Sequence, residues 1–174
     1  SLFQLNAEAA IVPTRELYVA ANNSAAKLPY EIQKAYGLVK DAANYSSNHK
    51  EPTEGSYEAL LDNNAGTIFH STWSDSTALA QTHYIQADFG EGNAVGGFYF
   101  YMTPRSNGKN FPVKMTVSGS NDNQEFERIA QLEETTGFST VIGDDTKKYQ
   151  YIRLTVDSTN TADNNFFALS ELYF

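Results

Sequence analysis

The hydrophobic pattern of the chain changes near residue 55. After that point apolar and polar residues alternate in short runs, as in HYIQADFG (83–90), PVKMTVSG (112–119) and YIRLTV (151–156). A period of two places alternate side chains on opposite faces of a strand, so each run predicts a strand with one buried face. VGGFYFYM (95–102) predicts a further strand, with tyrosines on one face and phenylalanines on the other.

Clusters of turn-forming residues separate these runs. GEGN, RSNGKN and SNDNQ are rich in Gly, Asn and Asp, which favour tight turns. Many short strands joined by such turns, without helices between them, indicate an all-β fold. The expected architecture is an antiparallel β-sandwich or a barrel.

The first part of the chain has a helical composition instead. Within residues 29–44 apolar side chains recur at intervals of three and four, which predicts an amphipathic helix. An earlier segment, residues 14–22, is compatible with a short helix or a strand. We therefore expect an N-terminal extension, residues 1–55, followed by the sandwich, residues 56–174. The apolar stripe of the predicted helix consists of Ile32, Ala35, Tyr36, Val39 and Ala43.

Charge and composition narrow the classes of partner. A net charge of -9, from 21 acidic and 12 basic residues without blocks of like charge, disfavours nucleic acid and anionic membrane surfaces. The absence of cysteine excludes disulfides, zinc-thiolate sites and thiol nucleophiles. The chain begins without a methionine and ends on a strand-like run, and we expect it to be a piece of a longer protein.

The sequence carries no motif of a common enzyme class. The three histidines, at positions 49, 70 and 83, lack the His-x-x-x-His spacing, and no Gly-x-Ser-x-Gly elbow or phosphate-binding glycine loop is present. The adjacent acids Glu133-Glu134 and Asp144-Asp145 are better explained as solvated surface acids. Glycoside hydrolysis needs two carboxyls that face one bond, roughly 5 to 9.5 Å apart. We expect a chain that is not an enzyme.

Six stretches, in this order, resemble one known family: LLDNNAGTIFHSTWS, HYIQADFG, YMTPR, VSGSNDNQEFERIA, YQYIRLTV and FFALSELYF. The resemblance is to the discoidin domain, also called the coagulation factor 5/8 type C domain, and most closely to the bacterial family 32 carbohydrate-binding modules. It implies a distorted jelly roll like that of galactose-binding domains, with ligand-binding loops at one end, over roughly residues 56–174.

The loop around residues 62–67 has the composition of a cation site. Asp62, Asn64 and Thr67 offer a carboxylate, a carbonyl and a hydroxyl, the hard oxygen ligands that calcium takes. The alternative is a metal-free turn in which Asp62 caps backbone amides. The resemblance implies a structural calcium ion as cofactor. Its ligands would be the carbonyls of Ala59, Asn64, Thr67 and Ser170, the Thr67 hydroxyl, and the side chains of Asp62 and Glu171.

The resemblance also implies a sugar site at the loop end. In galactose-binding members a histidine, an arginine, an asparagine and an aromatic residue converge on one sugar. An imidazole and a guanidinium can bridge the axial hydroxyl of galactose, and an aromatic ring can cover its apolar face. The matching positions are His70, Arg105, Asn110 and either Phe166 or Phe167, while Trp73 either adds a second surface or packs below the loop.

The sequence thus favours a non-catalytic carbohydrate-binding module for galactose or N-acetylgalactosamine, within a larger extracellular, cell-surface or periplasmic glycan-processing protein. The alternative is a protein-interaction or spacer module that braces neighbouring domains of a longer parent chain and binds no sugar. Exposure of Ile32, Tyr36 and Val39 would favour that alternative. Lipid-headgroup adhesion, as in the blood-clotting relatives, is disfavoured by the net charge and by the lack of the cysteine pair that ties their termini.

Overall fold

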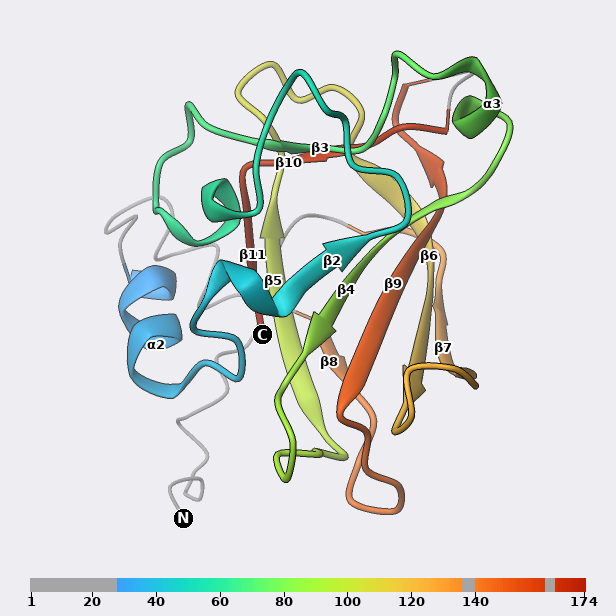
Figure 1. The fold of residues 1–174 in the computed structure, drawn as a ribbon. Coiled ribbons are helices and arrows are strands. Elements are labelled where there is room, and N and C mark those ends of the chain that lie inside the picture. Colours follow the sequence, from blue (N-terminus) through green and yellow to red (C-terminus); the bar gives the residue numbers. More distant parts are fainter. Residues whose placement is uncertain (1–27, 136–139, 162–164) are drawn as a thin grey trace.

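Two antiparallel sheets face each other and enclose the core (Figure 1). The structure, a computed structural model, describes residues 28–135, 140–161 and 165–174. Within these residues the larger sheet is five-stranded, in the order β2-β4-β9-β6-β7, and the smaller is three-stranded, in the order β11-β5-β8. A pairing of β10 with β3 lies at one end of the sandwich. The antiparallel sandwich expected from the sequence is confirmed.

The strands of the larger sheet are β2 (Tyr45–Ser47), β4 (His83–Asp88), β9 (Tyr151–Thr159), β6 (Pro112–Ser120) and β7 (Glu127–Leu132). Those of the smaller sheet are β11 (Glu171–Tyr173), β5 (Phe98–Thr103) and β8 (Thr140–Ile142), and the end pair is β3 (Phe69–His70) with β10 (Ala168–Leu169). The helical elements are α2 (Leu28–Tyr36), α3 (Ser76–Leu79) and the 3-10 turns η1 (Ala42–Asn44) and η2 (Glu58–Leu61). None of the described helices is long and apolar enough to cross a bilayer.

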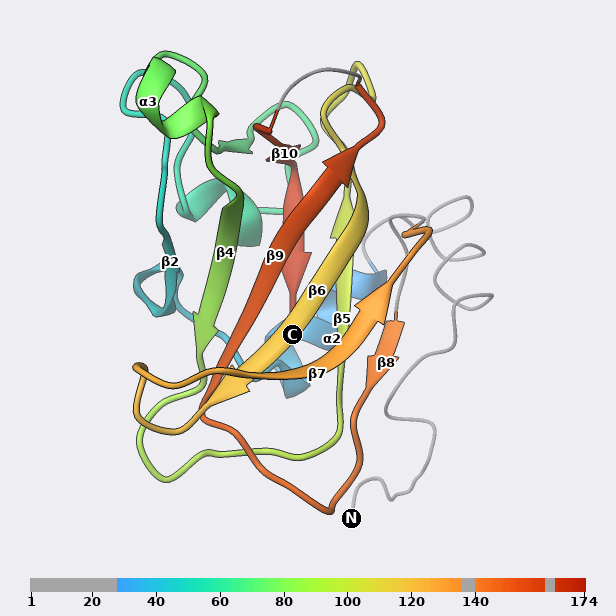
Figure 2. The same cartoon turned by 90° about the vertical axis from the view of Figure 1, so that its right-hand side faces the viewer.

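The alternation read from the sequence determines which side chains enter the core. β4 and β9 pair with Ile85 opposite Leu154 and Ala87 opposite Ile152, and all four side chains are buried. Figure 2 shows these strands as the face of the larger sheet, with β5 and β11 behind them. Burying an isoleucine or leucine side chain contributes about 1.5 to 3 kcal/mol, so these residues hold the larger sheet against the core.

β5 separates the main core from a second apolar cluster. On one face Phe100 lies 6.0 Å from Phe174, ring to ring, inside the main core. On the other face Tyr101 stacks on Tyr173 at 5.4 Å, and Tyr30 of α2 lies 6.3 Å from Tyr173. The predicted division of tyrosines and phenylalanines is therefore confirmed, and Tyr30 and Ile32 of α2 pack against the tyrosine face.

The helix predicted for residues 29–44 is shorter than expected, because α2 ends at Tyr36. Glycine is a poor residue for a helix interior, and Gly37 follows directly. Leu38 then donates its N–H to the carbonyl of Phe174 at 2.7 Å, so the chain leaves the helix to meet the C-terminal strand. A tertiary hydrogen bond thus overrides the helical period of the sequence.

The sheet begins before the boundary predicted at residues 55 and 56. Asp41 accepts a hydrogen bond from the N–H of Ala43 and starts η1, and β2 follows directly. Tyr45 of β2 pairs with Ala87 of β4, so this strand belongs to the larger sheet. The segment 14–22, for which helix and strand were both compatible, lies outside the described residues.

Candidate functional site

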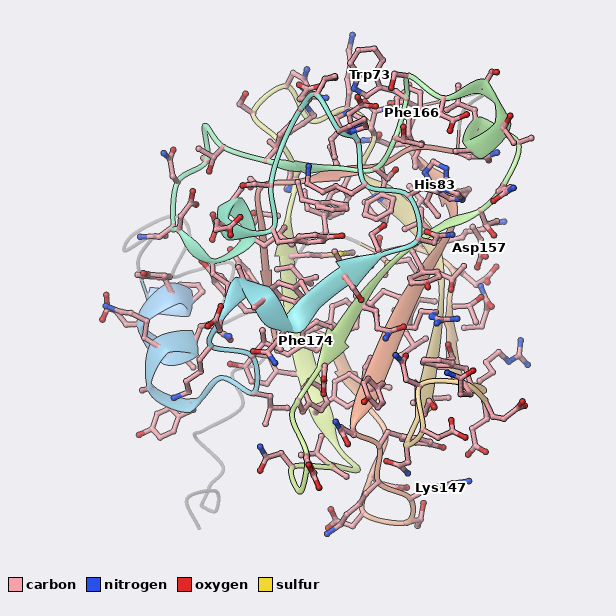
Figure 3. All side chains as sticks on the ribbon, viewed as in Figure 1. Trp73, His83, Lys147, Asp157, Phe166 and Phe174 are labelled. Atoms are coloured by element: carbon pink, nitrogen blue, oxygen red, sulfur yellow. The ribbon has the colours of Figure 1, made fainter. Side chains whose placement is uncertain are left out.

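The candidate site lies at the end of the sandwich closed by β3 and β10. Trp73 and Phe166 both lie at this end (Figure 3). Trp73 follows β3 and Phe166 precedes β10, so the β3–β10 pairing brings these distant segments together. The structure thus gathers most of the predicted sugar-contacting residues in one place.

His70 is buried beneath this surface, with 2% of its area exposed. Its Nδ1 donates to the carbonyl of Ser71 at 2.7 Å, and its ring lies 5.5 Å from that of Phe166. Burial lowers the pKa of His70, against the opposing effects of the bond to Ser71 and of Glu54. The imidazole is therefore neutral near pH 7, and Nε2 is left as a hydrogen-bond acceptor.

Trp73, Glu54 and Arg105 form a connected group beside His70. Trp73, 42% exposed, donates its indole N–H to one carboxylate oxygen of Glu54 at 3.0 Å. The other oxygen of Glu54 lies 3.7 Å from Nη2 of Arg105. Sequence reasoning missed Glu54, because nothing in its neighbourhood along the chain indicates a contact with positions 73 and 105.

The two candidate phenylalanines have different environments, which resolves the alternative left by the sequence. Phe167 is fully buried and its ring packs against that of Phe69 at 5.7 Å. The prediction that Phe167 contacts the sugar is therefore wrong, because its side chain belongs to the core. Phe166 is half-buried beside His70, and it is the phenylalanine that can present an aromatic face.

Asn110 holds the end of the Arg105 loop against β10. Its backbone adopts a left-handed φ of 62°, which asparagine tolerates better than most residues. Its carbonyl accepts from the N–H of Ala168 at 3.0 Å, and Ala168 pairs with His70 across β3 and β10. The structure thus brings Asn110 next to the strand pair that carries His70, although only 7% of the residue is exposed.

A second acid that sequence reasoning missed, Glu51, lies under the Trp73 loop. It is fully buried, and its carboxylate accepts from the backbone N–H groups of Trp73 and Ser74. Burial alone would raise its pKa, but hydrogen bonds from Thr53, Trp73 and Ser74 outweigh that effect and lower it. Glu51 is therefore a buried carboxylate ion.

The predicted cation loop and the last strand meet as expected. Glu171 accepts from the backbone N–H of Asn63 at 3.1 Å and of Asn64 at 3.2 Å, and the Thr67 hydroxyl donates to Asp62. Burial and the nearby Asp62 raise the pKa of Glu171 to about 8, since two close carboxylates repel each other.

The carboxylate, carbonyl and hydroxyl oxygens around this pair are the ligands that calcium takes. A divalent cation would also remove the repulsion between Asp62 and Glu171. Within the described ranges no three His, Cys, Asp or Glu side chains cluster, so a metal here would also need carbonyl oxygens. The turn alternative also has support, because Asp62 accepts from the N–H of Asn64 at 3.0 Å. The paired acids at 133–134 and 144–145 are exposed and lie outside both sites.

Comparisons with known proteins agree with this architecture. Among solved structures the chain is similar to CpGH89CBM32-5 from Clostridium perfringens, which is in complex with GalNAc-β-1,3-galactose. The two chains share 19% identity, the match covers 76% of this chain and 95% of that one, and the TM-score is 0.58. This chain is similar to the family 32 module of NanJ from the same organism, in complex with galactose, at 19% identity, 76% and 93% coverage and a TM-score of 0.55.

It is also similar to the C-terminal domain of a chitobiase from Bacteroides fragilis, at 23% identity, 77% and 94% coverage and a TM-score of 0.54. These likenesses show the fold. None of the curated proteins compared with the chain matches it. The F5/8 type C domain model matches residues 42–172, which is most of the chain. The chain therefore belongs to the F5/8 type C domain family.

Proposed function

We propose that the chain is a non-catalytic carbohydrate-binding domain for galacto-configured sugars, galactose or N-acetylgalactosamine. The observation that carries the proposal is the convergence of His70, Arg105 and Phe166 at one end of the sandwich, beside Trp73 and Glu54. The guanidinium of Arg105 and the carboxylate of Glu54 offer donors and acceptors to sugar hydroxyls, and the aromatic faces suit the apolar side of the ring. The neutral imidazole of His70 lies buried against Phe166 beneath them. Two similar modules are described in complex with galactose or a GalNAc-containing disaccharide, which supports the choice of sugar.

The expected affinity of the proposed site for a single sugar is low. Stacking on one ring buries roughly 60 Å² of apolar area, worth about 1.5 kcal/mol. Two or three hydrogen bonds to charged groups add about 1.5 to 3 kcal/mol each, against an association cost of at least about 4 kcal/mol. The expected dissociation constant is on the order of 0.1 to several mM.

Such an affinity is useful when the domain is tethered. In a longer parent chain, binding at one site raises the effective concentration of a linked domain at the same glycan. We therefore propose an extracellular, cell-surface or periplasmic role, as one domain of a glycan-processing protein. The spacer alternative predicts that Ile32, Tyr36 and Val39 are exposed. It has less support, because Val39 is buried, Ile32 packs on the tyrosine cluster, and of the three only Tyr36 is exposed.

We also propose a structural calcium ion between the 58–67 loop and β11. Asp62 and Glu171 would hold it with their carboxylates, together with the carbonyls of Ala59, Asn64, Thr67 and Ser170 and the Thr67 hydroxyl. The ion would supply positive charge where two carboxylates lie close together, and it would tie the loop to the last strand. Asp62 and Glu171 lie apart from the His70 group in the contacts described, so its role would be stability rather than sugar contact.

A glycan array tests the proposed function. The expected result is selective retention by glycans that end in galactose or N-acetylgalactosamine, with weaker signals from glucose-terminated glycans. Silence across the array at millimolar-equivalent ligand densities would contradict the proposal and favour the spacer alternative. In that case α2 and its exposed Tyr36 become the surface to examine for a neighbouring domain.

A further inference from the structure

The buried carboxylate of Glu51 collects the hydrogen bonds that shape the Trp73 loop. Its Oε1 accepts from the Thr72 hydroxyl at 3.1 Å and from the backbone N–H groups of Trp73 at 3.0 Å and Ser74 at 3.1 Å. All three donors come from consecutive residues, which follow β3 after Ser71. The loop therefore curls around one oxygen atom of an ion that solvent does not reach.

The second carboxylate oxygen of Glu51 connects this loop to another one. Its Oε2 accepts from the N–H of Thr53 at 3.1 Å, the Thr53 hydroxyl at 2.6 Å and the Ser74 hydroxyl at 3.1 Å. Thr53 and Ser74 are more than twenty positions apart in the chain, and they meet through this single group. A buried charge is tolerated only when it is satisfied by hydrogen bonds. The Glu51 carboxylate meets that condition, because both of its oxygens accept hydrogen bonds from neutral backbone N–H and side-chain hydroxyl groups.

Glu51 joins the loop that carries Trp73 to the loop that carries Glu54, and these two residues make the hydrogen bond of the exposed indole. Trp73 is held at its own backbone N–H, and Glu54, which accepts the Trp73 indole N–H, directly follows Thr53. The backbone N–H of Glu51 also donates to the carbonyl of His70 at 2.9 Å. One residue thus fixes Trp73, Glu54 and the strand of His70 relative to each other.

We propose that Glu51 is the positioning residue of the candidate sugar site. It holds the Trp73 loop in its binding conformation without touching the ligand, because it is fully buried. The ordering of Trp73 stands on the geometry alone, and the consequence for sugar affinity rests on the proposed function. A neutral amide cannot replace the carboxylate, because its NH2 group would face donors that then remain unpaired.

Glu51→Gln tests this proposal, and the chain supplies its own probe because Trp73 is the single tryptophan. Time-resolved fluorescence anisotropy measures the local motion of the indole in the whole chain, with no sugar present. The expected result is a larger amplitude of fast local motion in the variant. In calorimetry, affinity for galactose or N-acetylgalactosamine should fall about tenfold or more, the factor that about 1.4 kcal/mol produces.

Asp75→Asn is the matched control, because it makes the same chemical change just beyond the loop. Asp75 accepts from the N–H groups of Thr77 and Ala78 and caps α3, without contacting Glu51 in the described hydrogen bonds. Its anisotropy and affinity should equal those of the unaltered chain. If Glu51→Gln does not fold, the double variant Thr53→Val with Ser74→Ala removes hydroxyl donors at exposed positions and should show the same changes at smaller amplitude.

The two readouts separate the possible failures. Unchanged indole motion in folded Glu51→Gln, or in the double variant if the single variant does not fold, would overturn the positioning role whatever the sugar results. If indole motion increases in Glu51→Gln but the unaltered chain binds no sugar, the positioning role is supported and only the proposed function is contradicted. Increased motion with unchanged sugar affinity would overturn the link between Trp73 order and binding.

Discussion

The indole N–H of Trp73 donates to Glu54 at 3.0 Å, and the opposite carboxylate oxygen of Glu54 lies 3.7 Å from Arg105. An aromatic face, an anion and a cation are thereby fixed side by side at the loop end of the sandwich. Partly exposed ion pairs contribute at most about 1 kcal/mol to stability. The group therefore orients binding side chains more than it stabilises the fold. Substitutions in it should lower sugar affinity while changing the free energy of unfolding little.

The neighbouring phenylalanines provide one such separation. Phe167→Ala removes a fully buried ring that packs on Phe69, and it should lower the free energy of unfolding by about 3 to 5 kcal/mol. Phe166→Ala removes a half-buried ring beside His70, and it should weaken sugar binding with a much smaller loss of stability. Urea unfolding and calorimetry of both variants check this. Equal losses of stability would show that both rings serve the core.

Calcium should raise the melting temperature without changing sugar affinity. A ligand present at 100 times its dissociation constant stabilises the native state by about 2.7 kcal/mol, and a chelator should remove that gain. Asp62→Asn removes one of the two carboxylates and should abolish most of the response. Asp122→Asn is the control, since that acid caps a turn at Gln124 and Glu125 away from the loop. A melting temperature that ignores both calcium and chelator would contradict the proposed ion.

His83 should make stability depend on pH below neutrality. It is fully buried, Nε2 donates to the carbonyl of Ala78 at 2.9 Å, and Nδ1 accepts from the Ser71 hydroxyl at 2.7 Å. Burial lowers its pKa, and the His49 ring at 5.0 Å acts in the same direction. The unfolded chain therefore binds the proton first, and this contribution to stability is lost as the pH falls below about 6.5.

The variant His83→Gln isolates that contribution from all other groups. The difference in melting temperature between the unaltered chain and the variant should be larger at pH 8 than at pH 5. Thermal unfolding by circular dichroism at both pH values measures it. A difference that stays constant, or that grows toward pH 5, would show that His83 is not buried in its neutral form.

The fold was predictable because its signal is local. Alternation in the runs at 83–90 and 151–156 depends only on which faces of the two strands meet the core, and Ile85 and Leu154 lie where the period of two places them. The end of α2 was only partly predictable, because Gly37 is a local stop signal but the path of the chain after it depends on the hydrogen bond from Leu38 to Phe174 at the other end of the chain. A local period cannot report such a contact.

The site was predictable only in part, for the same reason. The family resemblance supplied His70, Arg105, Asn110 and the pair Phe166 or Phe167 as candidates, and the structure brings His70, Arg105 and Phe166 to one end. The choice between Phe166 and Phe167 required the tertiary packing, since the Phe167 ring packs on Phe69 in the core while the Phe166 ring lies against His70. Glu51 and Glu54 were missed because their partners lie about twenty or more residues away, at Trp73, Ser74 and Arg105.

The most direct test of sugar binding is titration calorimetry of the unaltered chain and of Arg105→Ala with galactose and N-acetylgalactosamine. Lys109→Ala, an exposed cation on the same loop, is the matched control. The unaltered chain and the control should give saturable heat in the millimolar range. Arg105→Ala should give none while its melting temperature stays close to that of the unaltered chain. Binding retained at full strength by Arg105→Ala, or no heat from the unaltered chain, would contradict the proposed site.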